Sequence, residues 1–239
     1  MAQDASKKKL GFSTVLAYGF GDVGCNFSWM FVGNFLMFFY TDVFCISMSA
    51  VATLMLVSRV WDAMNDPLVG ILADRTRTRW GRFRPWLAFG APLTAIVLAL
   101  TFWAHPGWSD GAKIAYMYVT YALLVFGYTC VNLPYGTLCG AMTQDIDERA
   151  RLNTSRSLAA MIAIGVINVI TLPLVNAFGG KTSAAAYLSV AILYGAIFAA
   201  CHLFCFAKTR ETVAPAVRAK VPLGVQLKSV ARNPPYLAG

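Results

Sequence analysis

Residues 57–70 (VSRVWDAMNDPLVG) lie in the middle of a long apolar run, yet they include Arg59, Asp62, Asn65 and Asp66. On a helix, which turns by about 100° per residue, Arg59, Asp62 and Asp66 fall within an arc of roughly 60°, and Asn65 sits beside Asp62. Near the centre of a bilayer, each ionised group costs on the order of 2.5–3.5 kcal/mol. One arginine and two aspartates leave a single negative charge, which a small cation would neutralise. The spacing therefore predicts a cation site, with an ion pair between Arg59 and either aspartate as the structural alternative.

The composition is that of a membrane protein. Of the 239 residues, 58% are hydrophobic and only 13% are charged, whereas a soluble domain usually has about 25% charged residues. The length suits one compact bundle of helices, so the expected fold class is all-α and polytopic. The net charge of +9 sits between the apolar runs, where basic residues act as topology signals, and nucleic acid is not an expected partner.

Six apolar runs predict six transmembrane helices, at about residues 11–40, 49–73, 86–103, 113–139, 156–178 and 184–207. Residues 1–10 are expected to form a polar tail, residues 143–153 a polar loop, and residues 208–239 a basic loop or tail. Pro67 is expected to kink the second helix, and Asn132-Leu133-Pro134 to interrupt the fourth. Glycines predict close helix packing in the first helix, at positions 19, 21, 24 and 33.

The basic residues predict the orientation in the membrane. Lys and Arg in the two tails and in the loops after the second and fourth helices fall on one side, and the other side has only Lys113 and Lys181. Because the side rich in Lys and Arg is cytoplasmic, both termini are expected in the cytoplasm. The protein itself is expected to be integral to the plasma (inner) membrane.

Enzyme chemistry is not expected. The sequence has no Ser/His/Asp set and no Gly-rich phosphate loop, and its acids at 62 and 66 lie on one helix face beside their own arginine. The segment Cys201-His202-xx-Cys205 lacks a second ligand cluster, so we expect neither a metal site nor a cofactor. The six cysteines follow no disulfide pattern and are interpreted as small buried side chains.

Several motifs resemble one transporter family. The segment WDAMNDPLVGILADRTRTRWGRFRP is similar to the second helix and following loop of the glycoside–pentoside–hexuronide:cation symporters, the melibiose-permease-like members of the major facilitator superfamily. YGFGDVGCNF, FFYTDV, VNLPYGTLCGAMTQDIDERARL and FCFAKTRET extend the resemblance, and the last two are most similar to the glucuronide-transporter branch. The resemblance implies twelve helices in two six-helix halves around a substrate cavity. This chain would supply the first half and is expected to be a fragment of a longer protein, with a six-helix protein that dimerises as the alternative.

The resemblance also implies a cation site. Asp62, Asn65 and Asp66 match the family's cation-site motif, and Thr129 matches a hydroxyl contributed by the fourth helix. Carboxylate, amide and hydroxyl oxygens are ligands that suit Na⁺, a hard cation. The same carboxylates would bind H⁺ instead where burial favours their neutral form.

The implied sugar site differs from that of melibiose permease. Asn26 and Asn132 stand where melibiose permease has acids that bind sugar hydroxyls, and Gly136 stands where it has a stacking Trp, while Arg156 is retained. Fewer acids near Arg156 favour an anionic, glucuronide-like sugar, because Arg pairs with carboxylates; neutral pentosides, which also bind amides, are the alternative. Asp22, one turn before Asn26, lies either in the cavity or near the cytoplasmic end of its helix. The aromatic candidates for sugar stacking are Tyr18, Trp29, Tyr128 and Tyr135.

Two charged segments resemble gating loops. Asp74, Arg75, Arg79, Gly81 and Arg82 match the superfamily's loop between the second and third helices, whose charge pairs latch the outward-facing state, and Arg59 joins this charge network. A second mix of acids and bases, interpreted as a gate network or a solvated face, comprises Asp145, Asp147, Glu148, Arg149 and Arg151.

These patterns together predict a sugar symporter coupled to Na⁺ or H⁺. The expected partners are a sugar or glycoside, membrane lipid, and either the missing second half or a second copy of the chain. The alternative is a membrane sugar sensor that binds its ligand without moving it.

Overall fold

The computed structural model describes residues 9–105 and 107–213, and these residues form helices and contain no β-strand. The α-helices are α1 (Phe12–Phe38), α2 (Met48–Arg75), α3 (Ala91–Thr101), α4 (Asp110–Met142), α5 (Ile146–Ala177) and α6 (Ala184–Lys208), with π-helical segments η1 (Phe39–Val43) after α1 and η2 (Trp86–Gly90) before α3. The all-α prediction is confirmed. Most of the two predicted tails, 1–10 and 208–239, lies outside the described residues.

Four of these helices are long and apolar enough to cross a membrane. They are α1 with η1, α4, α5 and α6, while residues 86–101 form a shorter apolar helix. α2 has 28 residues but includes Arg59, Asp62 and Asp66. The described residues therefore form a multi-helix membrane bundle, and the count of six spans stays a prediction.

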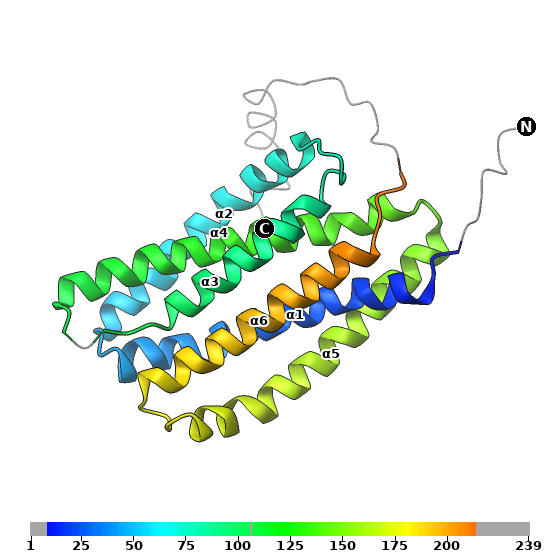
Figure 1. The fold of residues 1–239 in the computed structure, drawn as a ribbon. Helices are drawn as coiled ribbons and strands as arrows, with labels where there is room; N and C mark the ends of the chain where they lie inside the picture. The colour runs from blue at the N-terminus through cyan, green and yellow to red at the C-terminus, as the bar shows by residue number, and fades with distance from the viewer. Residues whose placement is uncertain (1–8, 106, 214–239) are drawn as a thin grey trace, which may run out of the picture.

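The bundle has α1 in contact with both α5 and α6, and α4 in contact with α2 and α3 (Figure 1). α3 also packs against α6, which joins the two groups of helices. The absence of a side chain at Gly19 lets α1 and α5 meet, since a Cβ there would lie 2.5 Å from Ser155 Oγ. Close packing is likewise found at Gly21 and Gly24, but nothing lies within 4 Å of a Cβ placed at Gly33.

Two apolar clusters fill the bundle, one towards each end. The first includes Phe31, Phe39 and Phe102, and the second includes Tyr18, Tyr135 and Phe198 among other residues. Along α1 and α4 the clusters meet between residues 25 and 31 and between residues 125 and 131. The predicted site residues Asn26, Thr129 and Asn132 fall at or beside this boundary, so the polar residues lie between two apolar layers.

The segment 143–153, predicted to be a loop, is helical from Ile146 onward. Asp145 caps this helix, because its carboxylate accepts hydrogen bonds from the backbone N–H groups of Asp147 and Glu148 at 2.9 and 3.1 Å. Glu148 is buried and accepts from the Leu10 backbone N–H at 3.1 Å and from Arg151 Nη1 at 2.7 Å. These acids therefore begin α5 and attach it to the start of α1.

The predicted interruption of the fourth helix is also wrong, since α4 continues through Asn132, Leu133 and Pro134. A proline inside a helix removes one backbone hydrogen bond, and neighbouring helices in a membrane bundle compensate for such a loss. Pro134 is buried against the rest of the bundle, which fits this explanation. Pro67 similarly lies inside α2 without ending it.

Candidate functional site

A pocket of about 430 Å³ lies between α1, α2 and α4. Its lining contains two acids of α2, Asp62 and Asp66, together with Thr129 and Asn132 of α4. The remaining lining residues are Trp29, Val125, Tyr128 and Leu133. Three predicted cation ligands and one predicted sugar ligand thus share a single pocket.

Asn65, the fourth predicted cation ligand, is placed differently. It is only 4% exposed and does not line the pocket. Neither its Oδ1 nor its Nδ2 has a hydrogen-bond partner within the described residues. The structure therefore groups Asp62, Asp66 and Thr129 and leaves Asn65 as a buried, unsatisfied amide next to them in sequence.

Arg59 is exposed on α2 and forms no ion pair with either aspartate. The ion pairs of residues 9–105 and 107–213 are Arg82–Asp74, Lys113–Asp110, Arg151–Glu148 and Arg156–Asp22. The structural alternative for the two pocket acids, an ion pair with Arg59, is therefore not present. Both carboxylates remain available to a ligand.

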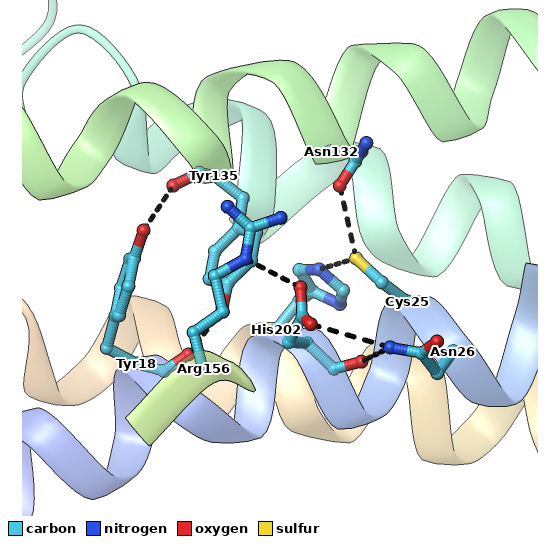
Figure 2. A network of polar contacts seen from close by, with 8 residues as sticks. Tyr18, Cys25, Asn26, Asn132, Tyr135, Arg156 and His202 are labelled. Atoms are coloured by element: carbon cyan, nitrogen blue, oxygen red, sulfur yellow. Dashed lines mark hydrogen bonds and ion pairs between the residues drawn. The ribbon is translucent and has the colours of Figure 1, made fainter. Parts of the chain in front are cut away.

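Asp22 and Arg156 form an ion pair between α1 and α5. Arg156 Nε donates to Asp22 Oδ1 at 2.8 Å, and the side chains are 33% and 11% exposed, respectively. Asn26 Nδ2 donates to the backbone oxygen of Asp22 at 2.8 Å (Figure 2). Asp22 thus belongs to the polar interior and not to the helix end. This pair bears on the predicted preference for an anionic sugar, which assumed that Arg156 has few acids near it. Asp22 is such an acid, and its carboxylate balances the positive charge of Arg156.

Cys25 of α1 lies between the pocket residue Asn132 of α4 and His202 of α6. Its Sγ lies 3.5 Å from Asn132 Oδ1 and 3.5 Å from His202 Nε2. Figure 2 shows both contacts as dashed lines. His202 Nδ1 lies 2.8 Å from the Phe198 carbonyl oxygen, so Nδ1 carries the proton and Nε2 is an acceptor. The described residues contain no group of three His, Cys, Asp or Glu side chains that would hold a metal ion.

The four aromatic candidates separate into two pairs. Tyr18 and Tyr135 are fully buried, and each hydroxyl donates to the backbone oxygen of the other residue, at 3.4 and 2.6 Å. Trp29 and Tyr128 instead line the pocket and stack with ring centroids 4.4 Å apart. Only the second pair is positioned to meet a ligand.

The predicted gating loop contains one long ion pair, Arg82 to Asp74 at 3.9 Å, while Arg75 is exposed and unpaired in the described part of the chain. The main contact of this loop is with Glu211, a residue that was not among the predicted site residues. The Glu211 carboxylate accepts from the backbone N–H groups of residues 82, 83 and 84 at 2.8, 2.7 and 3.1 Å. Gly81, with φ +111°, leaves the room that this carboxylate occupies. In the sequence, the only indications of this contact are the acid of FCFAKTRET, which is Glu211, and the loop glycine, Gly81.

Comparison with known proteins identifies the family. Residues 17–238 match the family described as MFS/sugar transport protein. The chain is 36% identical over 228 residues to the glucuronide carrier protein homolog of Escherichia coli (strain K12), covering 95% of this chain and 50% of the relative. It is 37% identical over 235 residues to the isoprimeverose transporter of Lactiplantibacillus pentosus, covering 97% and 49%, respectively. A third relative, the inner membrane symporter YicJ of Escherichia coli (strain K12), is 39% identical over 207 residues, covering 87% and 44%.

The chain spans about half the length of the curated relatives it matches. The relatives' names confirm the resemblance seen in the motifs, and they describe transporters and not enzymes. Together with its apolar helices, the match shows that this multi-pass membrane protein belongs to the MFS/sugar transport protein family.

Proposed function

We propose that this chain forms the cation-binding and sugar-binding half of a cation-coupled sugar symporter. The observation that carries the proposal is that Asp62 and Asp66, free of any ion pair within the described residues, share a pocket with Thr129 and Asn132. Unpaired carboxylates in a membrane bundle are costly, and they are retained where an ion or a proton passes.

The cation site uses Asp62, Asp66 and Thr129, residues of α2 and α4 that line the pocket. We include the Oδ1 of Asn65 as a fourth ligand, which requires its side chain to turn from the packed interior towards the pocket. The energetic reason is the amide itself, because a buried polar group without a partner costs about 1–3 kcal/mol. Na⁺ accepts all four oxygen ligands. H⁺ is the competing coupling ion, since protonation of either carboxylate also removes the unbalanced charge.

The sugar site uses Asn26, Asn132, Asp22 and Arg156. Arg156 gives only Nε to Asp22, and its Nη1 and Nη2 have no hydrogen bond within the described residues. Two adjacent terminal donors suit a carboxylate, which supports a glucuronide-like substrate. The name of the glucuronide carrier protein homolog agrees with this class of substrate. The name of the isoprimeverose transporter leaves other sugars as alternative substrates.

The wider organisation follows from the family resemblance. The proposal includes six membrane spans with both termini in the cytoplasm of an inner-membrane protein, and a second six-helix half or a second copy that closes the cavity. In this arrangement the Asp74–Arg82 pair, Arg75 and Arg59 belong to the contacts that change between the inward-open and outward-open states.

Substitution of Asp62 tests the cation site. We would measure binding of 4-nitrophenyl glucuronide to the purified chain in lipid nanodiscs by calorimetry, with and without Na⁺ and at acidic and alkaline pH. Wild type should bind in a cation-dependent way, and Asp62→Asn should remove that dependence. The matched control is Asp110→Asn, because the Asp110 side chain is 92% exposed at the start of α4.

Two results would contradict the proposed cation site or the proposed substrate class. Unchanged Na⁺ and pH dependence in Asp62→Asn would exclude the carboxylate from coupling. Tighter competition by 4-nitrophenyl galactoside than by the glucuronide would exclude the preference for an anionic sugar. Binding without uptake, after reconstitution into liposomes with the second half of the transporter, would favour the sensor function.

A further inference from the structure

Three aromatic rings lie in a row that ends in the pocket, and of the two neighbouring pairs only Tyr128 and Trp29 are stacked, while Phe198 and Tyr128 are tilted by 30°. Phe198 of α6 lies 6.4 Å from Tyr128 of α4, and Tyr128 lies 4.4 Å from Trp29 of α1, between ring centroids. The planes of Trp29 and Tyr128 differ by 22°, which is a stacked arrangement. Trp29 has no further aromatic partner within the described residues, so the row of rings ends at the indole. Three helices thus hold the orientation of one half-buried ring at the pocket wall.

The groups around this ring complement a pyranose. One face of a pyranose presents C–H groups, and its edge presents hydroxyls. The face of an aromatic ring carries partial negative charge and attracts C–H groups, while carboxylate and amide groups bind hydroxyls. The pocket combines the indole of Trp29 with the amide of Asn132, beside Asp62 and Asp66 of the proposed cation site, and its 430 Å³ is within the range of small-ligand sites.

The other aromatic candidates are excluded by their positions. Tyr18 and Tyr135 are 0% exposed, and both hydroxyls are occupied by backbone oxygens. Gly136 offers no ring at all. We propose that Trp29 is the stacking surface for the sugar ring and that Tyr128 and Phe198 are positioning residues that hold its indole. This inference rests on the proposed function and adds the residue that selects a pyranose by shape.

The test compares variants of Trp29 in the purified full chain. Trp29→Leu keeps an apolar side chain but removes the ring, and Trp29→Phe keeps a smaller ring. We expect the Kd for 4-nitrophenyl glucuronide to rise about 10-fold in Trp29→Leu and about 3-fold in Trp29→Phe, while the Kd for Na⁺ changes less than about 2-fold. The control is Trp103→Leu, since Trp103 packs against Trp108 and does not line this pocket.

A second measurement uses the wild-type chain and does not depend on a variant folding. Saturating glycoside should protect Trp29 from oxidation by N-bromosuccinimide, as read by peptide mass spectrometry, while Trp103 reacts at its usual rate. If saturating glycoside does not protect Trp29 from oxidation, or if the Kd for the glycoside is unchanged in Trp29→Leu, the inference is overturned and the proposed function stays intact. Weakened Na⁺ binding with unchanged sugar binding would overturn it in favour of a cation–π contact. If wild type binds no sugar under any cation condition, the proposed function fails and the inference fails with it.

Discussion

Removal of the Asp22 carboxylate should destabilise the bundle by leaving Arg156 without its counter-charge. The two groups meet at 2.8 Å, and their side chains are 11% and 33% exposed. Breaking a fully buried pair costs about 3–5 kcal/mol, and water that reaches the part-exposed Arg156 side chain lowers this for Asp22→Asn to about 2–3 kcal/mol. For a chain of this size that loss corresponds to a fall in melting temperature of roughly 4–12 °C.

A double-mutant cycle separates the pair from other effects. Arg156→Gln leaves the more deeply buried Asp22 carboxylate unbalanced, so it should cost at least as much as Asp22→Asn. The double variant places two neutral amides together and should be more stable than the sum of the single losses predicts. The assay is thermal unfolding in detergent micelles, with Asp110→Asn as the matched control, which should shift stability by less than about 0.5 kcal/mol.

Additive losses in the double variant would refute the ion pair, and so would a neutral effect of Asp22→Asn. The same variant carries a functional consequence. Without the Asp22 carboxylate, the positive charge of Arg156 is unbalanced, so binding of 4-nitrophenyl glucuronide should improve relative to the neutral galactoside. A shift towards the neutral sugar would show that Asp22 acts directly on sugar hydroxyls and does not act by balancing Arg156.

Three further outcomes follow from single contacts. Glu211→Ala removes the acceptor for three backbone N–H groups, so it should lower stability by about 1–3 kcal/mol and speed tryptic cleavage at Arg79. Gly81→Ala should also destabilise, but less in the Glu211→Ala background, because a Cβ at Gly81 collides with that carboxylate; equal losses in both backgrounds would contradict this. Tyr135→Phe should cost about 1 kcal/mol in thermal unfolding and Tyr18→Phe less, since their hydrogen bonds measure 2.6 and 3.4 Å.

The helices were largely predictable because apolar runs of membrane length have few other stable forms. The first, second and sixth predicted spans start and end within a few residues of the observed helices. The start of α5 was not predicted, since the charged segment 143–153 was interpreted by polarity alone. Asp145 followed by helix-forming residues is a capping signal that outweighs polarity, and it places the start of α5 ten residues earlier than the predicted start of the fifth span at 156.

The site was predictable only within single helices. The spacing of Asp62 and Asp66 places them on one face of α2, and the structure places both in the pocket. Asn65, one residue away, turns into the packed interior, and that depends on the rotation of α2 against α4. The pairing of Asp22 with Arg156 depends on how closely α1 approaches α5, which Gly19 allows. Contacts between residues this far apart in sequence require the packing to be known.

The charges of the polar interior lead to an order of binding. The Asp22–Arg156 pair is neutral as a unit. Asp62 and Asp66 line the pocket, and together with Arg59, which lies nearby on α2 outside the pocket lining, they leave one net negative charge on this stretch of the helix. A sugar carboxylate that enters first meets this charge, and at a separation of 4 Å two unit charges repel by about 4 kcal/mol near a protein surface. One bound cation removes the excess. For an anionic sugar, therefore, we expect the cation to bind first and to tighten sugar binding, and linkage requires the sugar to tighten cation binding by the same factor. A neutral sugar feels much less of this repulsion, so the size of the coupling distinguishes the two substrate classes.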